Sequence, residues 1–323
     1  MAKVVLVTGG TGLVGKAIET VIKEEQPVDE EWIFVGTKDA DLTNLESARA
    51  LFDRTRPTHV IHLAAMVGGL YDHLQKNLSY LRSNIYINDH VLLLSHEHKV
   101  QKVVSCLSSC IFPDKTSYPI DETMIHNGPP HDSNFGYGYA KRLIDITNRA
   151  YHLQYGSMFT SVVPCNIFGP HDNFHPNHSH AVPGLIQRMH ATINFDQSDK
   201  SPEDKVFTVM GTGKPLRQFI YSIDLAKLII WVLRNYDSIE PISLIPDESE
   251  EITIAQLAES IARAFEFKGR IEFDTSKSDG QHKKTASNAK LRRLYPDFRF
   301  TDFDIAIQQT VQWYQNNYEI ARK

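Results

Sequence analysis

Tyr137 and Lys141 are spaced so that together they could move a proton at a carbonyl group. They stand four residues apart in a segment predicted to be helical, which puts both side chains on one face of the helix. An ammonium group beside a phenol lowers the phenol pKa, so Tyr137 could exchange a proton with a carbonyl or hydroxyl oxygen. Lys141 could also hold a ribose hydroxyl. Tyr139 has the wrong spacing to Lys141 and is expected to pack.

Ser108, Ser109 and Cys110 follow an apolar run that predicts a strand. If the chain stays extended, Ser108 and Cys110 face the same side of the strand, roughly 7 Å apart. Ser108 could then hydrogen-bond the oxygen that Tyr137 protonates, which completes a Ser–Tyr–Lys set. Cys110 is either a base or nucleophile in the same reaction or a packing residue at the strand end. Ser109 points elsewhere.

A glycine-rich turn near the N-terminus, residues 8–15, has the pattern of a dinucleotide-binding fingerprint. It follows a predicted strand and opens a predicted helix, which is the context that such a fingerprint requires. Gly9 and Gly10 permit the tight turn, Gly12 lets the backbone approach a pyrophosphate, and Gly15 allows close packing of helix on strand. The helix N-terminus offers N–H groups to the phosphates. A bare strand–helix turn is the alternative.

The end of the second predicted strand indicates which dinucleotide binds. An NAD site usually carries an acidic residue there, which holds the adenosine 2′-hydroxyl. This strand ends in Val35-Gly36-Thr37-Lys38 with no acidic residue at its tip, so Lys38 could pair with the 2′-phosphate of NADP. A solvated surface lysine is the alternative for Lys38. Asp41 is expected to border the adenine.

Apolar runs of four to six residues alternate with longer helical patterns through the first half of the chain. This alternation predicts βαβ units and therefore a parallel sheet doubly wound with helices, an α/β fold of the Rossmann type. The predicted strands are 4–7, 32–35, 59–63, 102–107 and 160–163, and the predicted helices are 13–24, 45–55, 78–98 and 137–155.

After residue 168 short strands mix with helices, which predicts a smaller α+β unit. We expect residues 1–168 to bind the dinucleotide, with a return segment near 217–237, and residues 169–323 mainly to bind substrate. The charged segment 196–204 is expected to be a mobile surface excursion. The helices predicted in this half are 182–191, 223–235, 254–265 and 304–318. An apolar stripe predicts that the second of them is a core helix and not a membrane element: Leu225, Leu228, Ile229 and Val232.

The composition argues against several classes of function. The 323 residues carry a formal net charge of −5, so no basic field favours nucleic acid or an anionic membrane. The first apolar run is too short for a signal peptide or a membrane span. Three cysteines without metal-type spacing fit a reducing compartment. We therefore expect a cytoplasmic protein.

A polar loop, residues 169–180, is crowded with histidines, and imidazole is a common metal ligand. The spacing of His171, His175, His178 and His180 matches neither a tetrahedral zinc loop nor a helical pair four residues apart. No cluster of carboxylates or cysteines accompanies them. No metal site is therefore expected.

Together these motifs resemble the extended short-chain dehydrogenase/reductases that act on nucleotide sugars. The resemblance rests on the glycine fingerprint, on Leu63-Ala64-Ala65, on Ser108 and on the pair of Tyr137 and Lys141. Further segments narrow it to the GDP-L-fucose synthase family and extend it over nearly the whole chain. These segments are residues 64–69, 108–113, 166–174 and 277–280, with Lys283 and Lys284 following.

The resemblance implies one site for two kinds of chemistry on GDP-4-keto-6-deoxymannose. Hydrogens at C3 and C5 lie next to the 4-keto group, so a base can remove them if the enolate is stabilised. By resemblance, Cys110 is that base, and His180 is the acid that returns a proton on the opposite face. Ser108, Tyr137 and Lys141 match the residues that support reduction at C4 with NADPH.

The resemblance also carries binding roles to particular residues. Thr11 is neutral where some relatives place Arg near the 2′-phosphate, which shifts that role toward Lys38, and Met210 stands where related sequences often carry Trp. The residues expected to line the cofactor are Gly9, Gly10, Thr11, Gly12, Leu13, Val14, Gly15, Lys38, Asp41, Leu63, Ala64, Ala65, Cys106, Leu107, Ser108, Ser109, Lys141, Pro164, Cys165, Asn166, Ile167 and His180. Those expected to contact the GDP-sugar are Asn166, Arg188, Met210, Arg217 and Asp279.

Other members of the same superfamily are the main alternatives. A sugar-nucleotide dehydratase would carry acidic and threonine side chains beside the serine, where this chain has Ser109 and Cys110. A 4-epimerase needs no Cys/His pair, and a non-catalytic NADP-binding regulator would be expected to lose Tyr137 or Lys141. Helices 78–98 and 137–155 are expected to form a four-helix interface in a homodimer, as such pairs do in this superfamily.

Overall fold

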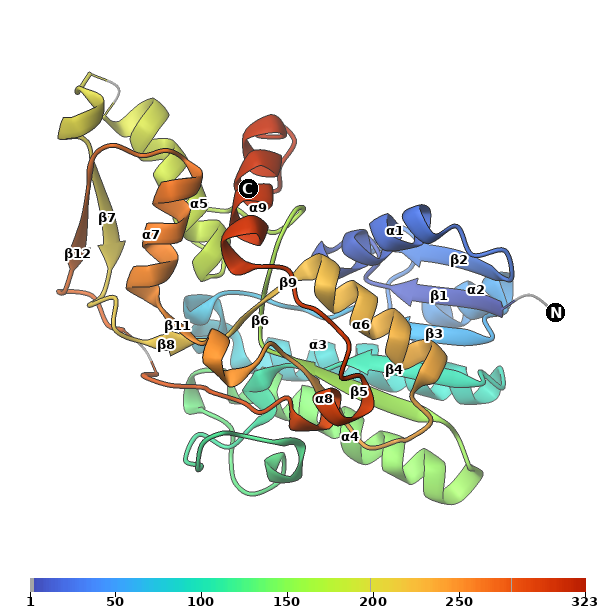
Figure 1. Ribbon diagram of the computed structural model, residues 1–323. Helices are drawn as coiled ribbons and strands as arrows, with labels where there is room; N and C mark the ends of the chain where they lie inside the picture. The colour runs from blue at the N-terminus through green and yellow to red at the C-terminus, as the bar shows by residue number, and fades with distance from the viewer. Residues whose placement is uncertain (1–2, 198, 280) are drawn as a thin grey trace.

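A parallel sheet of six strands forms the centre of the structure (Figure 1). The computed structural model describes residues 3–197, 199–279 and 281–323, so Gly280 of the 277–280 motif lies outside the described residues. The strands are β1 (Lys3–Thr8), β2 (Glu30–Val35), β3 (His59–His62), β4 (Lys102–Cys106), β5 (Phe159–Pro164) and β10 (Ile242–Leu244). They lie in the order β10-β5-β4-β3-β1-β2, and all neighbouring pairs are parallel. The direction of winding reverses between β1 and β3, where open sheets of this kind bind ligands.

Helices cover both faces of this sheet (Figure 1). One face carries α1 (Leu13–Glu25), α6 (Ser222–Asn235) and the short α8 (Ala289–Leu294). The other carries α2 (Leu45–Thr55), α3 (Leu70–Glu97) and α4 (Phe135–Tyr155). This arrangement confirms the predicted doubly wound α/β fold.

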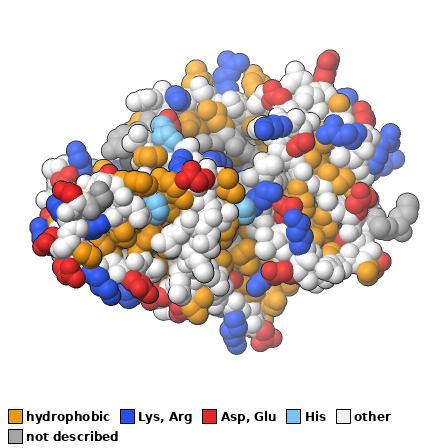
Figure 2. All heavy atoms as spheres, turned by 90° about the horizontal axis from the view of Figure 1, so that it is seen from above, with side chains coloured by type: hydrophobic (Ala, Val, Ile, Leu, Met, Phe, Trp, Pro, Cys, Tyr) orange, Lys and Arg blue, Asp and Glu red, His pale blue; other side chains and the backbone are white. Residues whose placement is uncertain are grey.

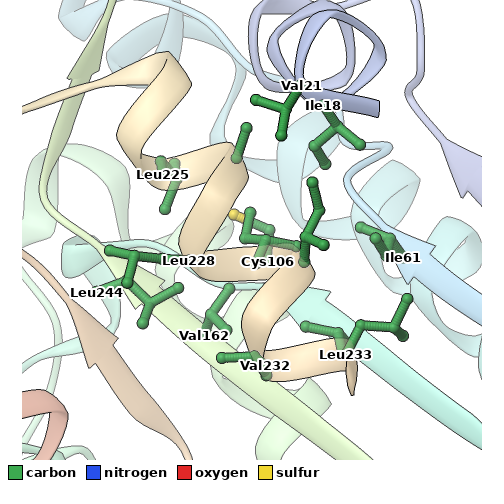
Figure 3. Close-up of a cluster of buried hydrophobic side chains, with 14 of the residues drawn as sticks. Ile18, Val21, Ile61, Cys106, Val162, Leu225, Leu228, Val232, Leu233 and Leu244 are labelled. Carbon is green, nitrogen blue, oxygen red and sulfur yellow. The ribbon is translucent and has the colours of Figure 1, made fainter. Parts of the chain in front are cut away.

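The stripe predicted on helix 223–235 is part of the core between α6, α1 and the sheet (Figure 3). Leu225, Leu228 and Val232 are fully buried. They lie among side chains from α1, such as Ile18, and from the sheet, such as Val162 (Figure 3). Burying each such side chain stabilises the fold by roughly 1.5–3 kcal/mol, which explains why this helix returns to the sheet.

A second group of elements lies beside the carboxyl ends of the strands (Figure 1). Its own core is rich in aromatic side chains, among them Phe168, Phe207 and Tyr314. The helices are α5 (Ala181–Ala191), α7 (Ile254–Ala264) and α9 (Phe303–Asn316). The strands are β6 (Asn166–Phe168), β7 (Val206–Met210), β8 (Leu216–Arg217), β9 (Phe219–Tyr221), β11 (Ile252–Thr253) and β12 (Arg270–Asp274), paired as β6 with β9, β7 with β12 and β8 with β11. The boundaries at residues 168 and 169 stay a prediction.

Several element ends differ from those predicted, and two of these differences bear on the site. Helix α3 begins at Leu70 instead of residue 78, and its backbone is non-helical at Lys76 (φ −128°, ψ 26°). This break interrupts the helical spacing of apolar residues, so the sequence pattern predicts only the part of the helix that follows it. Strand β4 ends at Cys106, and a one-turn helix over Ser109–Ile111 follows.

The segment predicted as a mobile excursion, residues 196–204, starts at the end of a helical turn over Thr192–Asp196 and holds a second short turn over Pro202–Asp204. The Gln197 side chain exchanges two hydrogen bonds with the Val206 backbone, at 2.8 and 2.9 Å. The segment is therefore anchored at its ends, and its mobility stays a prediction.

The surface carries charges of both signs. On the face drawn in Figure 2, basic and acidic side chains are interspersed among apolar ones. Within the described ranges, no helix has the length and apolar character needed to cross a membrane.

Candidate active site

The glycine turn after β1 is built for close backbone approach. Gly9 has φ +71°, and a side chain there would meet the Ala64 backbone nitrogen at 2.8 Å. A Cβ on Gly15 would lie 2.5 Å from the backbone of Gly10. Helix α1 starts at Leu13, and no side chain caps its first N–H groups. No acidic residue in the first turn offsets the partial positive charge of this helix end. This cradle fits a dinucleotide pyrophosphate.

We expect Gly15→Ala to destabilise the protein and to weaken NADPH binding. The added methyl group meets backbone atoms that cannot rotate away, so we expect a loss of roughly 1–3 kcal/mol in the free energy of unfolding. Urea denaturation and fluorescence titration with NADPH measure the two effects. Gly128→Ala is the matched control, because a Cβ there meets only Pro113 at 3.4 Å. Equal behaviour of the two variants would contradict the packing argument.

The corner expected to hold the adenosine brings Thr11 against the end of β2. A Cβ on Gly36 would lie 2.5 Å from the Thr11 hydroxyl, so the turn and the strand end touch. The Gly36 N–H donates to Asp39 Oδ2 at 2.8 Å, and Lys38 beside it is exposed. Asp41 accepts hydrogen bonds from the Thr43 N–H and hydroxyl, at 2.9 and 2.7 Å. The roles of Lys38 and Asp41 stay predictions.

Ser108 and Cys110 are neighbours, although not for the reason predicted. The chain does not stay extended: Ser108 caps the short helix that starts at Ser109, so the argument from alternating strand faces is wrong. A serine at the end of a strand favours this turn because its hydroxyl can accept a backbone N–H two residues on. The Ser108 Oγ accepts from the Cys110 N–H at 3.3 Å. The Asn134 Nδ2 donates to Cys110 Sγ at 3.0 Å, a contact that sequence reasoning missed.

Tyr137 and Lys141 lie buried on α4, one turn apart, as predicted. Burial raises the pKa of Tyr137, the charges of Cys110 and Cys106 add to this, and a hydrogen bond with Ser108 opposes it. The expected lowering of this pKa is therefore wrong: burial outweighs any effect of the ammonium, and the Lys141 Nζ donates to the Cys106 carbonyl at 2.8 Å. Burial also lowers the pKa of Lys141. A phenol that stays protonated at neutral pH suits a proton donor.

Two adjoining cavities open beside Ser109. Ser108, Tyr137 and Lys141 are not among the described residues that line them. Cys110, Asn134 and His131 line the first, which holds about 380 Å³ including its open mouth. Pro164, Cys165 and Asn166, predicted from the resemblance, line the second. Ser109 and Lys284 line both cavities.

Lys284 reaches the cavities because its segment crosses back over the first half of the chain. The Ile120 N–H donates to the Thr285 carbonyl at 2.9 Å, and the Ser287 N–H donates to the Ile120 carbonyl at 2.7 Å. In the sequence, Lys284 belongs to a segment that resembles the family and carries no predicted site role. No local pattern marks it as a site residue.

The histidine loop packs against the start of α3. His178 Nδ1 lies 2.7 Å from Asp72 Oδ2. His180 is the N-cap residue of α5, and much of its surface is exposed. Protein atoms nevertheless surround its imidazole and lower the pKa of His180, and the charge of Arg322 lowers it further. His180 acts electrostatically on the buried His73, whose ring centroid lies 5.4 Å from that of Tyr137. His73 therefore lies beside Tyr137, and nothing in its sequence context indicated this.

Asp172 is a buried carboxyl group in the same loop. It is 3% exposed, and its Oδ1 accepts from the Asn173 N–H at 2.7 Å. Its Oδ2 finds no hydrogen-bond partner among the described residues. Burial raises the pKa of Asp172 to about 7, with the Asn173 hydrogen bond and the Arg322 charge opposing.

We expect the ionisation of Asp172 to destabilise the folded chain as the pH rises from about 4 to 7, so the stability of the wild type should fall relative to that of Asp172→Asn over this range. The pKa of Asp172 is higher in the folded chain than in the unfolded chain, so ionisation above the unfolded value favours unfolding, by roughly 2–4 kcal/mol in all. Urea denaturation at pH 5 and pH 8 measures the difference. The same pH dependence in both proteins would contradict this expectation.

The residues expected to contact the GDP-sugar lie on the second group of elements. Burial lowers the pKa of Arg188 and of Arg217. The Arg217 guanidinium donates to the Gln281 carbonyl at 2.6 Å. Both carboxylate oxygens of Asp279 already accept from Thr212, at 2.6 and 2.7 Å, so Asp279 closes that turn. Met210 is 56% exposed on β7. Substrate contacts by these residues stay predictions.

Metal ligands do not gather in the described part of the chain, where no group of three or more His, Cys, Asp or Glu could hold an ion.

Comparison with known proteins places this site in a family. The pattern of the NAD dependent epimerase/dehydratase family matches residues 5–245, which include the glycine turn, Ser108, Cys110, Tyr137 and Lys141. The chain belongs to the NAD dependent epimerase/dehydratase family. The match confirms the predicted resemblance to extended short-chain dehydrogenase/reductases.

Several known proteins are similar to this chain over nearly its full length. A probable GDP-L-fucose synthase of Drosophila melanogaster is 64% identical over 321 residues, covering 99% of this chain and 100% of the relative. A GDP-L-fucose synthase of Dictyostelium discoideum is 55% identical, covering 99% and 98%. A GDP-L-fucose synthetase of Naegleria fowleri, solved with NADP bound, superposes with a TM-score of 0.91 at 46% identity, covering 99% and 96%.

Proposed function

We propose that this protein is a GDP-L-fucose synthase, which converts GDP-4-keto-6-deoxy-D-mannose to GDP-L-fucose by 3,5-epimerisation and 4-keto reduction. The observation that carries the proposal is that groups suited to reduction and a group suited to epimerisation lie side by side. Ser108 and Tyr137, which suit reduction, lie against Cys110, which suits epimerisation. Relatives that share nearly the whole chain are named for this activity.

The epimerisation half needs a base, an acid and an oxyanion partner. Cys110 as thiolate removes a proton from the carbon next to the 4-keto group, and the Asn134 amide steadies the sulfur. His180 returns a proton to the opposite face. The Ser108 hydroxyl and the Tyr137 phenol donate to the oxygen on which the negative charge develops. The contacts among Ser108, Cys110 and Tyr137 support the roles of these three residues, and the resemblance supports the role of His180.

The reduction half uses the same oxygen. NADPH, when bound, supplies the hydride that adds to C4. The Tyr137 phenol donates its proton to the oxygen, so the keto group becomes a hydroxyl. Lys141 donates to the Cys106 carbonyl, and from that position it can also hold a ribose hydroxyl. The turn 9–15, Thr11 and Lys38 would hold the pyrophosphate and the 2′-phosphate.

Incubation with GDP-4-keto-6-deoxymannose in D₂O tests the proposal. Without NADPH we expect deuterium at C3 and C5, detected by mass spectrometry and NMR, and no GDP-L-fucose. With NADPH we expect GDP-L-fucose and one NADPH oxidised for each product formed. Oxidation of NADPH without deuterium at C3 and C5, or exchange without any reduction, would contradict a bifunctional enzyme.

We propose further that the protein is a homodimer that buries the outer surface of α3 and α4. These helices pack against each other, and each leaves apolar side chains exposed. The exposed residues are Leu74, Leu78, Tyr86, Tyr139, Leu143 and Ile146. An apolar surface of this kind on neighbouring helices supports association between two copies.

Light scattering at micromolar concentration tests the dimer. We expect a mass of twice 36.8 kDa for the wild type and a single-chain mass for Ile146→Asp, because a buried unpaired carboxylate opposes association. Val28→Asp is the control, since Val28 is 95% exposed in the turn before β2. A wild-type mass of 36.8 kDa would overturn the proposal.

We infer a cytoplasmic location from cysteine chemistry. Cys106, Cys110 and Cys165 are all free thiols, as a reducing compartment favours. Cell fractionation that recovers the native protein in an oxidising compartment would contradict this inference.

A further inference from the structure

A line of buried hydrogen bonds joins the glycine turn to the helix that carries Lys141. Thr8 Oγ1 lies 2.8 Å from His62 Nδ1, and His62 Nε2 lies 3.0 Å from Asn88 Oδ1. The Asn88 Nδ2 donates to the Ala140 carbonyl at 3.2 Å. Thr8, His62 and Asn88 are 0%, 0% and 5% exposed. None of these three side chains has a role in the chemistry derived above.

The position of the line follows from the sheet. Thr8 on β1 is the direct neighbour of His62 on β3, and both side chains face the layer of α3 and α4. Asn88 extends from α3 and meets both His62 and α4. Thr8 immediately precedes Gly9 of the cofactor turn, and Ala140 immediately precedes Lys141. The line therefore spans from one edge of the cofactor cradle to the other.

The chemistry of the end groups fixes the direction of every hydrogen bond. The Ala140 carbonyl can only accept, so the Asn88 NH₂ must face it and the Asn88 oxygen must face His62. His62 therefore donates from Nε2 and accepts at Nδ1, where the Thr8 hydroxyl is the donor. The Thr8 oxygen remains free to accept from the Ala64 N–H, at 3.4 Å.

His62 is held neutral in this arrangement. Burial lowers the pKa of His62 to about 3, and the nearby charge of Lys141 adds to this effect. The Asn88 oxygen accepts the hydrogen bond of the Nε2 proton, so in the neutral ring Nδ1 is left without a proton and accepts from the Thr8 hydroxyl. The neutral Nε2–H tautomer is thus the form that satisfies both neighbours.

We propose that His62 and Asn88 are positioning residues for the reductive half of the reaction: through Thr8 and Ala140 they fix the cofactor turn relative to Lys141. This proposal rests on the proposed function. Loss of the line leaves a buried donor or acceptor unpaired at each end, and the two cradle edges can then shift against each other. Cys110 and His180 stand on other segments, so proton exchange at C3 and C5 depends less on the line.

Two pairs of variants test the proposal. His62→Gln and Thr8→Val each break the line, and we expect about a tenfold rise in KM for NADPH with a fall in kcat for reduction. Deuterium exchange at C3 and C5 should stay within about threefold of wild type. Thr8→Ser keeps the hydroxyl and should restore wild-type values. His59→Gln is the control, because His59 lies on the same strand, is also buried and also contacts a threonine hydroxyl, Thr58, at 2.9 Å.

The outcomes separate a positioning role from a purely structural one. Parallel loss of exchange and reduction together with loss of folded protein, or unchanged KM and kcat in both line-breaking variants, would overturn the proposal. If the wild type shows neither exchange nor reduction, the proposed function fails instead. Nitrogen NMR of the wild type tests the line without any activity: His62 should show an unprotonated Nδ1 and a protonated Nε2 from pH 5 to 9. The opposite tautomer would overturn the assignment.

Discussion

Tyr137→Phe is expected to lower the rate of NADPH oxidation by about 10²- to 10⁴-fold while hydrogen exchange at C3 and C5 remains measurable. The phenol is the buried acid beside Ser108, and burial keeps it protonated at neutral pH. Phenylalanine fills the same space but has no proton to give, so the keto oxygen gains charge without neutralisation. Exchange continues at a reduced rate, because Ser108 still donates to the enolate oxygen.

Absorbance at the NADPH band and deuterium incorporation, measured on the same preparation, separate the two effects. Tyr139→Phe is the matched control: Tyr139 lies on the same helix, is 41% exposed and contacts Arg142 through its ring. It should keep both activities. Reduction by Tyr137→Phe within tenfold of wild type would remove Tyr137 from its role as proton donor.

Cys110→Ala is expected to suppress deuterium incorporation at C3 and C5 by about 10²- to 10⁴-fold, with NADPH binding unchanged. Cys110 lines the first cavity, and its sulfur accepts a hydrogen bond from Asn134. Its backbone N–H donates to Ser108, so the thiol lies close to the serine assigned to the keto oxygen. Alanine removes the base without adding bulk. Cys110→Ser should also suppress exchange, because a hydroxyl is a much weaker acid than a thiol and supplies little anion at neutral pH.

Fluorescence titration with NADPH provides the control, since a misfolded cradle would lose binding as well as exchange. We expect the binding constant of Cys110→Ala to stay within about threefold of wild type. Exchange at the full rate in Cys110→Ala would show that Cys110 is not the base. The Tyr137 and Cys110 variants are thus expected to fail in opposite halves of one reaction.

The layered fold could be predicted from the sequence because a parallel sheet covered on both faces is encoded in short continuous apolar runs. Helix α2, Leu45–Thr55, begins and ends where its pattern predicts, and Asn44 caps it through Ser47. The glycine turn was equally readable, since Gly9 and Gly15 meet backbone atoms that leave no room for a side chain. Local steric rules decide such features, so local sequence is sufficient to predict them.

The sequence predicts the candidate site only in part. The spacing of Tyr137 and Lys141 placed both on one helical face, because four residues make about one turn whatever lies around the helix. The same kind of argument failed at Ser108 and Cys110. There a side-chain hydrogen bond to the backbone ended the strand, and the alternation of faces ended with it. Strand geometry is decided by competition for backbone hydrogen bonds, which spacing alone does not reveal.

The sequence by itself determined which chemistry this protein carries: a glycine cradle, a phenol with an ammonium one turn away, and a thiol near a serine. The tertiary structure alone decided which groups surround them. Lys284 comes from a segment that crosses over Ile120, and His62 joins two edges of the cradle through Asn88. These contacts link residues far apart in the chain. They arise from the packing of whole layers, and no spacing along the sequence records them.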